Sequence, residues 1–370
     1  MEEVFIHALE GIFDAIYLPD IQDQAESFIR KLALAVFDVE IRRSQSRALG
    51  TRHSPGVLLS CYLDALPHAL AREQPEQATK AQSLVALIIS DLVSSENMHS
   101  GGASDIFAIL HQIANRFTAL CLDDPWARKS AGACGIRIMT NTPQFGIKWV
   151  TDREIDLVRT LLHILKDLPR DLPRDVDDVI DVLTRVLRIS NADVDFQADA
   201  ALHARAKLVH LVGLFFPELQ SSNPVVRQAA QACIELLVAL SGKPAVDLLM
   251  PHRDRMLVSI YTKPLRALPF LKQIGMIEAI RFCITLEPPL VELNDELLRL
   301  LHETLALADA DDAALLGRGI AIRQNTIEVV KLRVACIKLL TASMPLTDFF
   351  QRQPQTRQRY MLIIFSSQCP

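Results

Sequence analysis

The spacing of apolar residues is the feature that most constrains the fold of this chain. Apolar side chains recur at positions i, i+3, i+4 and i+7 in successive segments of about 15 to 22 residues, the period of one helix face. No segment shows the strict alternation typical of a half-buried strand. The clearest segments are 4–18, 21–41, 55–71, 78–93, 106–122, 125–139, 152–168, 176–189, 204–219, 224–240, 244–256, 271–286, 295–307 and 326–343. The sequence therefore predicts an all-α chain.

Composition narrows the class further. Hydrophobic residues make up 50% of the 370 residues and aromatics only 6%, which favours Leu-, Ala- and Val-rich helices. No apolar run reaches the roughly 18 residues of a membrane span, and the N-terminus lacks the basic region of a signal peptide. The net charge of -5 provides no overall field for nucleic acid. We therefore expect neither a membrane nor a direct nucleic-acid partner.

The cysteines show neither zinc-site nor disulfide-framework spacing. The sequence has no C-x-x-C pair, and the number of cysteines is odd. They are scattered, mostly within apolar segments, at Cys61, Cys121, Cys134, Cys233, Cys283, Cys336 and Cys369. Reduced core thiols of an intracellular protein are the favoured interpretation.

Several helix starts carry a capping signature. "TDRE" at residues 151–154 has the pattern of a capping box. Asn223-Pro224 and Asp124-Pro125 combine a capping side chain with a proline at the first helical position. Asn294 precedes two acidic residues that favour a helix N-terminus. Loops are expected at residues 99–105, 168–178 and 307–325.

Two of these helices resemble each other. "DPWARKSAGACGI", from residue 124, aligns without a gap with "NPVVRQAAQACIE", from residue 223. The shared small residues allow close approach of a neighbouring helix, and the offset of 99 residues is about two periods of a HEAT repeat. The pattern resembles the second helix of such a repeat. It predicts an α-solenoid of stacked HEAT-like helical hairpins over residues 1–370.

Motifs for catalysis are incomplete. "HRD" at residues 252–254 opens a kinase catalytic loop, yet the asparagine that should follow five residues after Asp254 is Ser259. We find no G-x-G-x-x-G, G-x-S-x-G, H-E-x-x-H or phosphate-binding loop. His203 and His210 lack a third ligand nearby, and the acidic residues Asp171, Asp175, Asp177, Asp178 and Asp181 precede and open a helix. We therefore predict no enzyme, and no catalytic, cofactor-binding or metal-binding residue.

The stretch that contains "HRD" is basic and interrupted by prolines. Its cations are Arg253, Arg255, Lys263 and Arg266. Pro264 and Pro269 predict a kinked connector rather than a continuous helix. Two interpretations stay open, a rigid solvated linker between repeats and a docking strip for an acidic partner segment.

The same stretch begins a long family-like run. Residues 250–319, which start "MPHRDRMLVSIYTKPLRALPFLKQIG", resemble the TRRAP family, as do "ARKSAGACGIRIM", "DVDDVIDVLTRVLRISN" and "VKLRVACIKLLTASM". The resemblance implies HEAT-like repeats most clearly over residues 123–345, less diagnostic helical repeats over residues 1–122, and a truncated terminal helix at residues 346–370.

The resemblance also implies a function. Members of the family are non-catalytic, kinase-related scaffolds that link transcription activators to histone acetyltransferase complexes, so the implied partners are activators and complex subunits, in the nucleus. It assigns no role to any single residue. The alternatives are a HEAT adaptor of another class, such as a nuclear transport or phosphatase scaffold, and an enzyme of the kinase-related group. Because the chain ends within the apolar segment "YMLIIFSSQCP", we expect a fragment or truncated product that aggregates when expressed alone.

Overall fold

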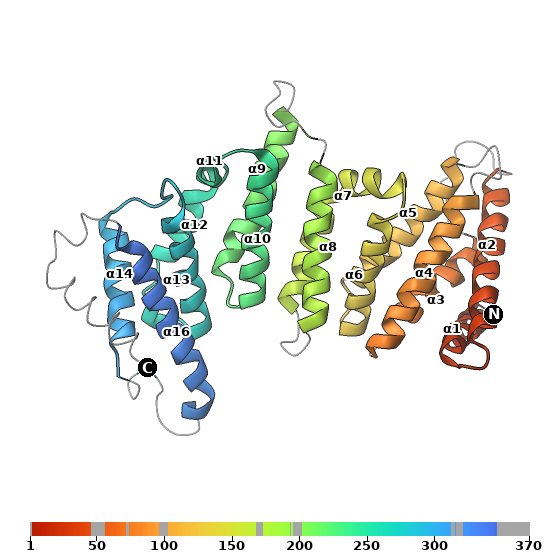
Figure 1. The fold of residues 1–370 in the computed structure, drawn as a ribbon, viewed down its shortest axis with the longest axis horizontal. Helices are drawn as coiled ribbons and strands as arrows, with labels where there is room; N and C mark the ends of the chain where they lie inside the picture. Colours follow the sequence, from red (N-terminus) through yellow and green to blue (C-terminus); the bar gives the residue numbers. More distant parts are fainter. Residues whose placement is uncertain are drawn as a thin grey trace. The chain divides into compact units, whose positions relative to one another are not determined.

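The chain folds into helices throughout its described part. The computed structural model describes residues 2–45, 56–71, 74–95, 103–167, 173–192, 194, 202–311, 315 and 321–345. Among these residues there are helices and turns but no strand (Figure 1). The all-α prediction is confirmed. The chain divides into two compact units, Met1–Ala192 and Asp193–Pro370.

Unit 1 is a double layer of helices. In chain order these are α1 (Glu2–Asp14), α2 (Gln22–Gln45), α3 (Val57–Leu70), α4 (Pro75–Ser95), α5 (Ala103–Leu120), α6 (Trp126–Thr140), α7 (Phe145–Asp167) and α8 (Pro173–Asn191). Helices α1, α3, α5 and α7 pack on one another in that order, and α2, α4, α6 and α8 do the same. Each helix thus packs on the helix two positions further along, which is the arrangement of a solenoid of helical hairpins (Figure 1).

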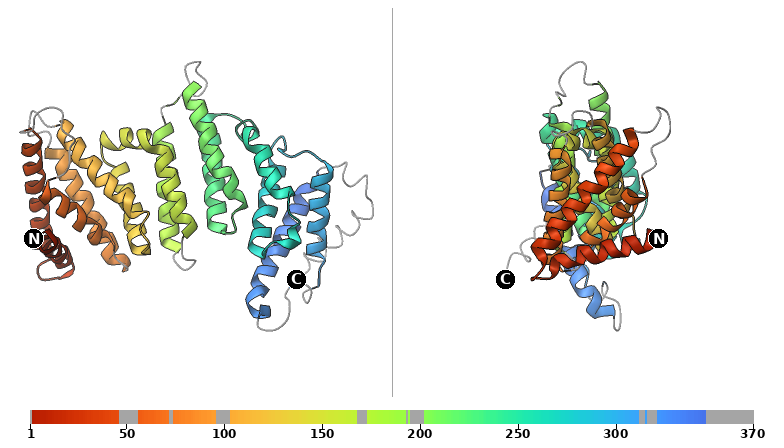
Figure 2. Two further views of the ribbon diagram at one scale, coloured as in Figure 1. Left: turned by 180° about the vertical axis from the view of Figure 1, so that it is seen from behind. Right: turned by 90° about the vertical axis from the view of Figure 1, so that its right-hand side faces the viewer.

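The described helices of unit 2 range from 5 to 23 residues, and several are joined by short turns. Its elements are α9 (Leu202–Phe215), α10 (Pro224–Ser241), α11 (Ala245–Leu249), α12 (Arg253–Tyr261), α13 (Phe270–Thr285), α14 (Asp295–Ala308) and α16 (Ala321–Ser343). Three 3-10 turns separate them, η4 (Phe216–Gln220), η5 (Met250–His252) and η6 (Leu265–Ala267). Both α10 and α13 pack on η4, and both α13 and α14 pack on α16 (Figure 2).

A glycine that the two aligned helices do not share, Gly132, sets the distance between α5 and α6. A Cβ atom placed on Gly132 of α6 would lie 2.6 Å from Cys121 Sγ and 2.8 Å from both the Cys121 nitrogen and the Phe117 carbonyl oxygen. Phe117 and Cys121 are fully buried. Only glycine at this position lets the two helix backbones approach so closely.

Two of the predicted caps are present. The Asn223 side chain accepts a hydrogen bond from the Val225 backbone N–H at 3.0 Å, with Pro224 at the first helical position of α10. The Asn294 side chain accepts one from the Leu297 N–H at 2.8 Å. At its other end α10 stops at Gly242, whose φ of 64° is the left-handed conformation that glycine tolerates best.

The capping box predicted at residues 151–154 is wrong. Helix α7 runs through it with only a kink at Arg153, and the Thr151 hydroxyl donates within the helix to the Ile147 carbonyl at 2.8 Å. Glu154 is buried and accepts a hydrogen bond from Asn191 Nδ2 at 2.5 Å. A tertiary contact between α7 and α8 therefore uses the side chain that a capping box would need.

Other boundaries also differ from the expectation. Pro125 is the N-cap residue of α6 rather than its first helical residue, and no side chain caps that end. Residues 244–256 form α11, η5 and the start of α12 instead of one helix. Helix α8 already begins at Pro173, inside the loop expected at 168–178. The terminal helix expected at 346–370 lies outside the described residues.

The buried thiols fit the expectation of reduced core cysteines. Six cysteines of the described part are buried and unpaired. Burial raises the pKa to about 12 in five of them, Cys121, Cys134, Cys233, Cys283 and Cys336. These thiols are packing groups.

Candidate protein-interaction surface

The histidine of the "HRD" stretch fastens α12 to α9. His252 Nε2 lies 2.8 Å from the Val209 carbonyl oxygen, at hydrogen-bond distance. Its ring also covers Gly213, where an added Cβ would lie 2.6 Å from His252 Cε1. The role of His252 is therefore structural.

Asp254 and Ser259, at the positions of the aspartate and the asparagine of a kinase loop, do not form a catalytic loop either. Asp254 is exposed at the start of α12. Ser259, at the position where a kinase needs asparagine, donates from its hydroxyl to Gln220 Oε1 at 2.9 Å and lies 2.8 Å from the Met256 carbonyl. The contacts of this segment are those of a helix packed on its neighbours.

Helix α12 has one buried and one exposed face. Met256, Ile260 and Tyr261 are buried, and burial raises the pKa of Tyr261 to about 12. On the exposed face lie Arg255 and Val258, the latter 61% exposed. An exposed cation and an exposed apolar side chain thus lie within one turn of each other.

Three of the four predicted docking residues are exposed and unpartnered. Arg255, Lys263 and Arg266 make no side-chain hydrogen bond or ion pair with the described part of the chain. We call these three residues the basic strip. Arg253 differs, because its guanidinium lies 3.4 Å from the Glu292 carboxylate and its side chain is only 22% exposed.

The turn that carries Lys263 and Arg266 is fixed by side chains from two helices. Leu265, between them, is fully buried, and its N–H donates to Glu303 Oε2 at 2.7 Å. Arg299 of α14 donates to the Tyr261 carbonyl at 2.5 Å. Gln273 of α13 donates to the Leu268 carbonyl at 2.6 Å. The connector that the prolines predicted is therefore firmly held on both sides.

Gln220 joins the elements beneath the strip. Its side chain accepts from Ser259 and donates to the Met256 carbonyl at 3.5 Å, and both partners belong to α12. Its backbone carbonyl accepts from Lys272 Nζ of α13 at 3.1 Å. Gln220 thus links η4, α12 and α13.

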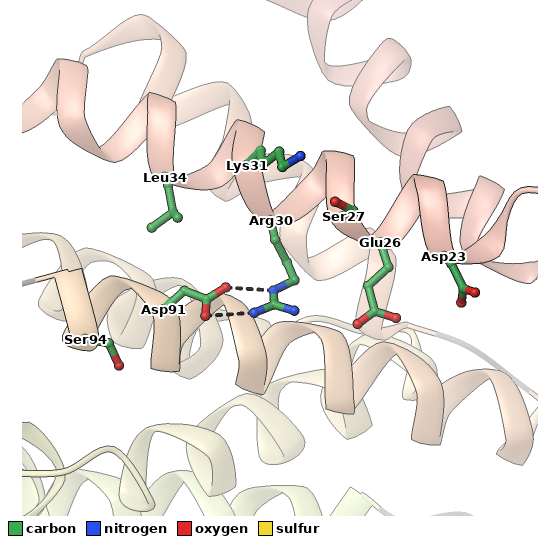
Figure 3. Close-up of a pocket in the computed structure, with 8 residues that line it drawn as sticks. All are labelled: Asp23, Glu26, Ser27, Arg30, Lys31, Leu34, Asp91 and Ser94. Atoms are coloured by element: carbon green, nitrogen blue, oxygen red, sulfur yellow. Dashed lines mark hydrogen bonds and ion pairs between the residues drawn. The ribbon is translucent and has the colours of Figure 1, made fainter.

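A hollow lies between α2 and α4 (Figure 3). It encloses ≈ 690 Å³ and has Arg30 at its centre. Arg30 forms a bidentate pair with Asp91, with distances of 2.7 and 2.9 Å. Its central cation is therefore already paired, while the charged side chains of Asp23, Glu26 and Lys31 also line the hollow. No local signal could have located it, because its walls come from segments about sixty residues apart in the sequence.

The described residues contain neither a candidate metal site nor a candidate membrane-spanning helix. No group of three or more His, Cys, Asp or Glu side chains among them is placed to hold a metal ion. In the same residues, no helix combines the length and the apolar character that crossing a membrane requires.

Paired helices stacked two positions apart define an α-solenoid of the HEAT type. The chain matches the family described as the Tra1 HEAT repeat ring region over residues 1–369, and it belongs to that family. The resemblance to the TRRAP family found in the sequence is confirmed.

Relatives come from yeasts and animals. The chain is 37% identical over 67% of its length to the SAGA complex/NuA4 acetyltransferase complex subunit Tra1 of Schizosaccharomyces pombe. It is 29% identical over 99% of its length to the corresponding subunit of Saccharomyces cerevisiae, and 23% identical over 99% to the human transformation/transcription domain-associated protein. The chain spans 7% of the first of these relatives and 10% of the other two.

Proposed function

We propose that this chain is a non-catalytic scaffold segment of a nuclear transcription coactivator, and that it contributes to assembly of a histone acetyltransferase complex. The observation that carries the proposal is the family match over residues 1–369 together with relatives named as SAGA and NuA4 subunits. Its partners are other subunits of such a complex and transcription activators.

The surroundings of the one enzyme-like motif support the non-catalytic part of the proposal. His252 is engaged with α9 and Ser259 with Gln220, so neither side chain is directed to a substrate or a nucleotide. Binding of ATP tests this point. We expect no binding by isothermal titration calorimetry, and a micromolar dissociation constant would reopen the assignment to a kinase-related enzyme.

The alternative is a HEAT adaptor of another class, such as a nuclear transport or phosphatase scaffold. Affinity purification of the tagged protein from its own cells, followed by mass spectrometry, separates the two classes. We expect acetyltransferase-complex subunits to be recovered. Enrichment of transport receptors or phosphatase subunits in their place would show the proposal to be wrong.

A further inference from the structure

We infer that the basic strip, Arg255, Lys263 and Arg266, is a docking site for an acidic peptide segment of a partner protein, and that Val258 receives an apolar side chain of that segment. The inference rests on the proposed scaffold function and specifies the chemistry of one of its partners.

The first support is the contrast between the strip and its neighbours. The nearby cations are engaged within unit 2, since Arg253 pairs with Glu292, Arg299 donates to Tyr261 and Lys272 donates to Gln220. The strip residues have no such partner in the described part of the chain. Their charges are available to carboxylates from outside.

The second support is the rigidity of the strip. Buried Leu265 and the Glu303 carboxylate fix the turn between Lys263 and Arg266, while buried Met256 and Ile260 fix the helix that carries Arg255. A surface that is ordered before binding loses little conformational entropy when a partner arrives. A solvated linker would not require this degree of fixation.

The spacing along the strip defines the shape of the ligand. Arg255 lies six residues before the end of α12 at Tyr261, about 9 Å along the helix axis, and Lys263 lies two residues beyond that end. An extended peptide covers about 3.3 Å per residue, so two of its acidic side chains about four residues apart would meet both cations. Val258 lies between them in the sequence and is 61% exposed, which matches an apolar residue between the two acids.

Nucleic acid fits this surface less well. The chain carries a net charge of -5, and the exposed carboxylate of Asp254 directly precedes Arg255 in α12. A phosphate backbone is uniformly charged and would be repelled by this carboxylate, whereas a peptide can place its acids selectively. Exposed Val258 also offers nothing to a phosphate.

The test is fluorescence anisotropy with the full chain and two fluorescein-labelled peptides. One peptide carries two glutamates four positions apart with a leucine between them, and the other has glutamine in place of each glutamate. We expect the first to bind at 50 mM salt and to weaken at 150 mM, where the Debye length is about 8 Å. We expect the glutamine peptide to bind at least tenfold more weakly.

The variants use a matched control. R255E/K263E/R266E should lower the affinity for the acidic peptide at least tenfold. V258S should lower this affinity several-fold, and that loss should depend little on salt. The control K148E/K331E/K338E makes the same change in net charge on three exposed lysines elsewhere, and we expect it to retain most of the affinity. Circular dichroism checks that each variant is folded, and R255Q/K263Q/R266Q replaces the charge reversal if that variant unfolds.

Two outcomes would overturn the inference. If the control variant lost as much affinity as the strip variant, the binding would be a general effect of charge. If a labelled DNA duplex bound with the same dependence on the strip and the acidic peptide did not bind, the ligand would be nucleic acid. Recovery of acetyltransferase subunits by the tagged protein is a separate readout, so failure of peptide binding at the strip leaves the proposed function standing and is distinguishable from failure of that function.

Discussion

The contact of Gly132 with α5 makes a prediction in which two opposed effects can be compared. In a helix interior, alanine is favoured over glycine by about 1 kcal/mol. At Gly132, however, the new methyl would lie 2.8 Å from the Phe117 carbonyl oxygen of α5 and 2.8 Å from the nitrogen of Cys121, the residue after α5. Backbone atoms cannot rotate away as a flexible side chain does. Overpacking of a buried contact costs about 1 to 3 kcal/mol. We expect Gly132→Ala to lower the free energy of unfolding of unit 1 by about 1 kcal/mol net.

Gly11→Ala is the matched control, because a methyl on Gly11 of α1 would meet nothing within 4 Å. This variant should gain up to about 1 kcal/mol. Urea denaturation followed by tryptophan fluorescence reports on unit 1, since both tryptophans, Trp126 and Trp149, lie in it. With an m-value of about 2 kcal/mol per molar, the two midpoints should differ by about 1 M. Equal stabilisation by both substitutions would refute the reasoning.

Three other predictions concern caps, an ion pair and thiols. Asn223→Ala should cost about 1 kcal/mol in urea denaturation because the Val225 N–H loses its acceptor, whereas Asn223→Asp should cost little; equal losses would contradict the cap. The hydrogen bond from Lys129, at 2.7 Å, holds the pKa of Asp167 below its ordinary value of 3.8. Asp167→Asn should therefore destabilise the protein at pH 7, and the difference in stability between variant and wild type should shrink as pH falls below about 3.8. A stability difference independent of pH would argue against the pair. Burial raises the thiol pKa from 9.0 to about 12 at Cys121, Cys134, Cys233, Cys283 and Cys336, so these thiols should not react with Ellman's reagent in the native protein at pH 8, and fast native labelling would contradict their burial. The free energy of unfolding should also fall as pH rises above about 9, because the thiols then ionise in the unfolded chain only.

Features that depend on a few adjacent residues could be predicted from the sequence. The helical period gave the fold class, and Asn223 and Asn294 cap the helices that follow them because the acceptor and the donor lie within three residues of each other. Pro264 likewise predicted a break after α12, because proline lacks the backbone N–H that a continuing helix would need there.

Features that depend on distant partners could not be predicted in this way. The "TDRE" pattern fits a capping box, yet Glu154 is held by Asn191, thirty-seven residues later. In the sequence, Arg253 cannot be distinguished from the other three cations of this stretch. The structure distinguishes it, because its guanidinium lies beside the Glu292 carboxylate. The sequence supplied the composition of the basic strip, and tertiary contacts decide which of its members are available.

Gln220 has a mechanical consequence for any protein that pulls on α12. A tensile force applied there would pass through the Ser259 and Met256 hydrogen bonds into η4, and from its carbonyl into Lys272 of α13. The load would be shared among these hydrogen bonds instead of resting on a single contact. A partner bound to α12 would therefore be connected through these hydrogen bonds to η4 and α13 rather than to a surface loop alone.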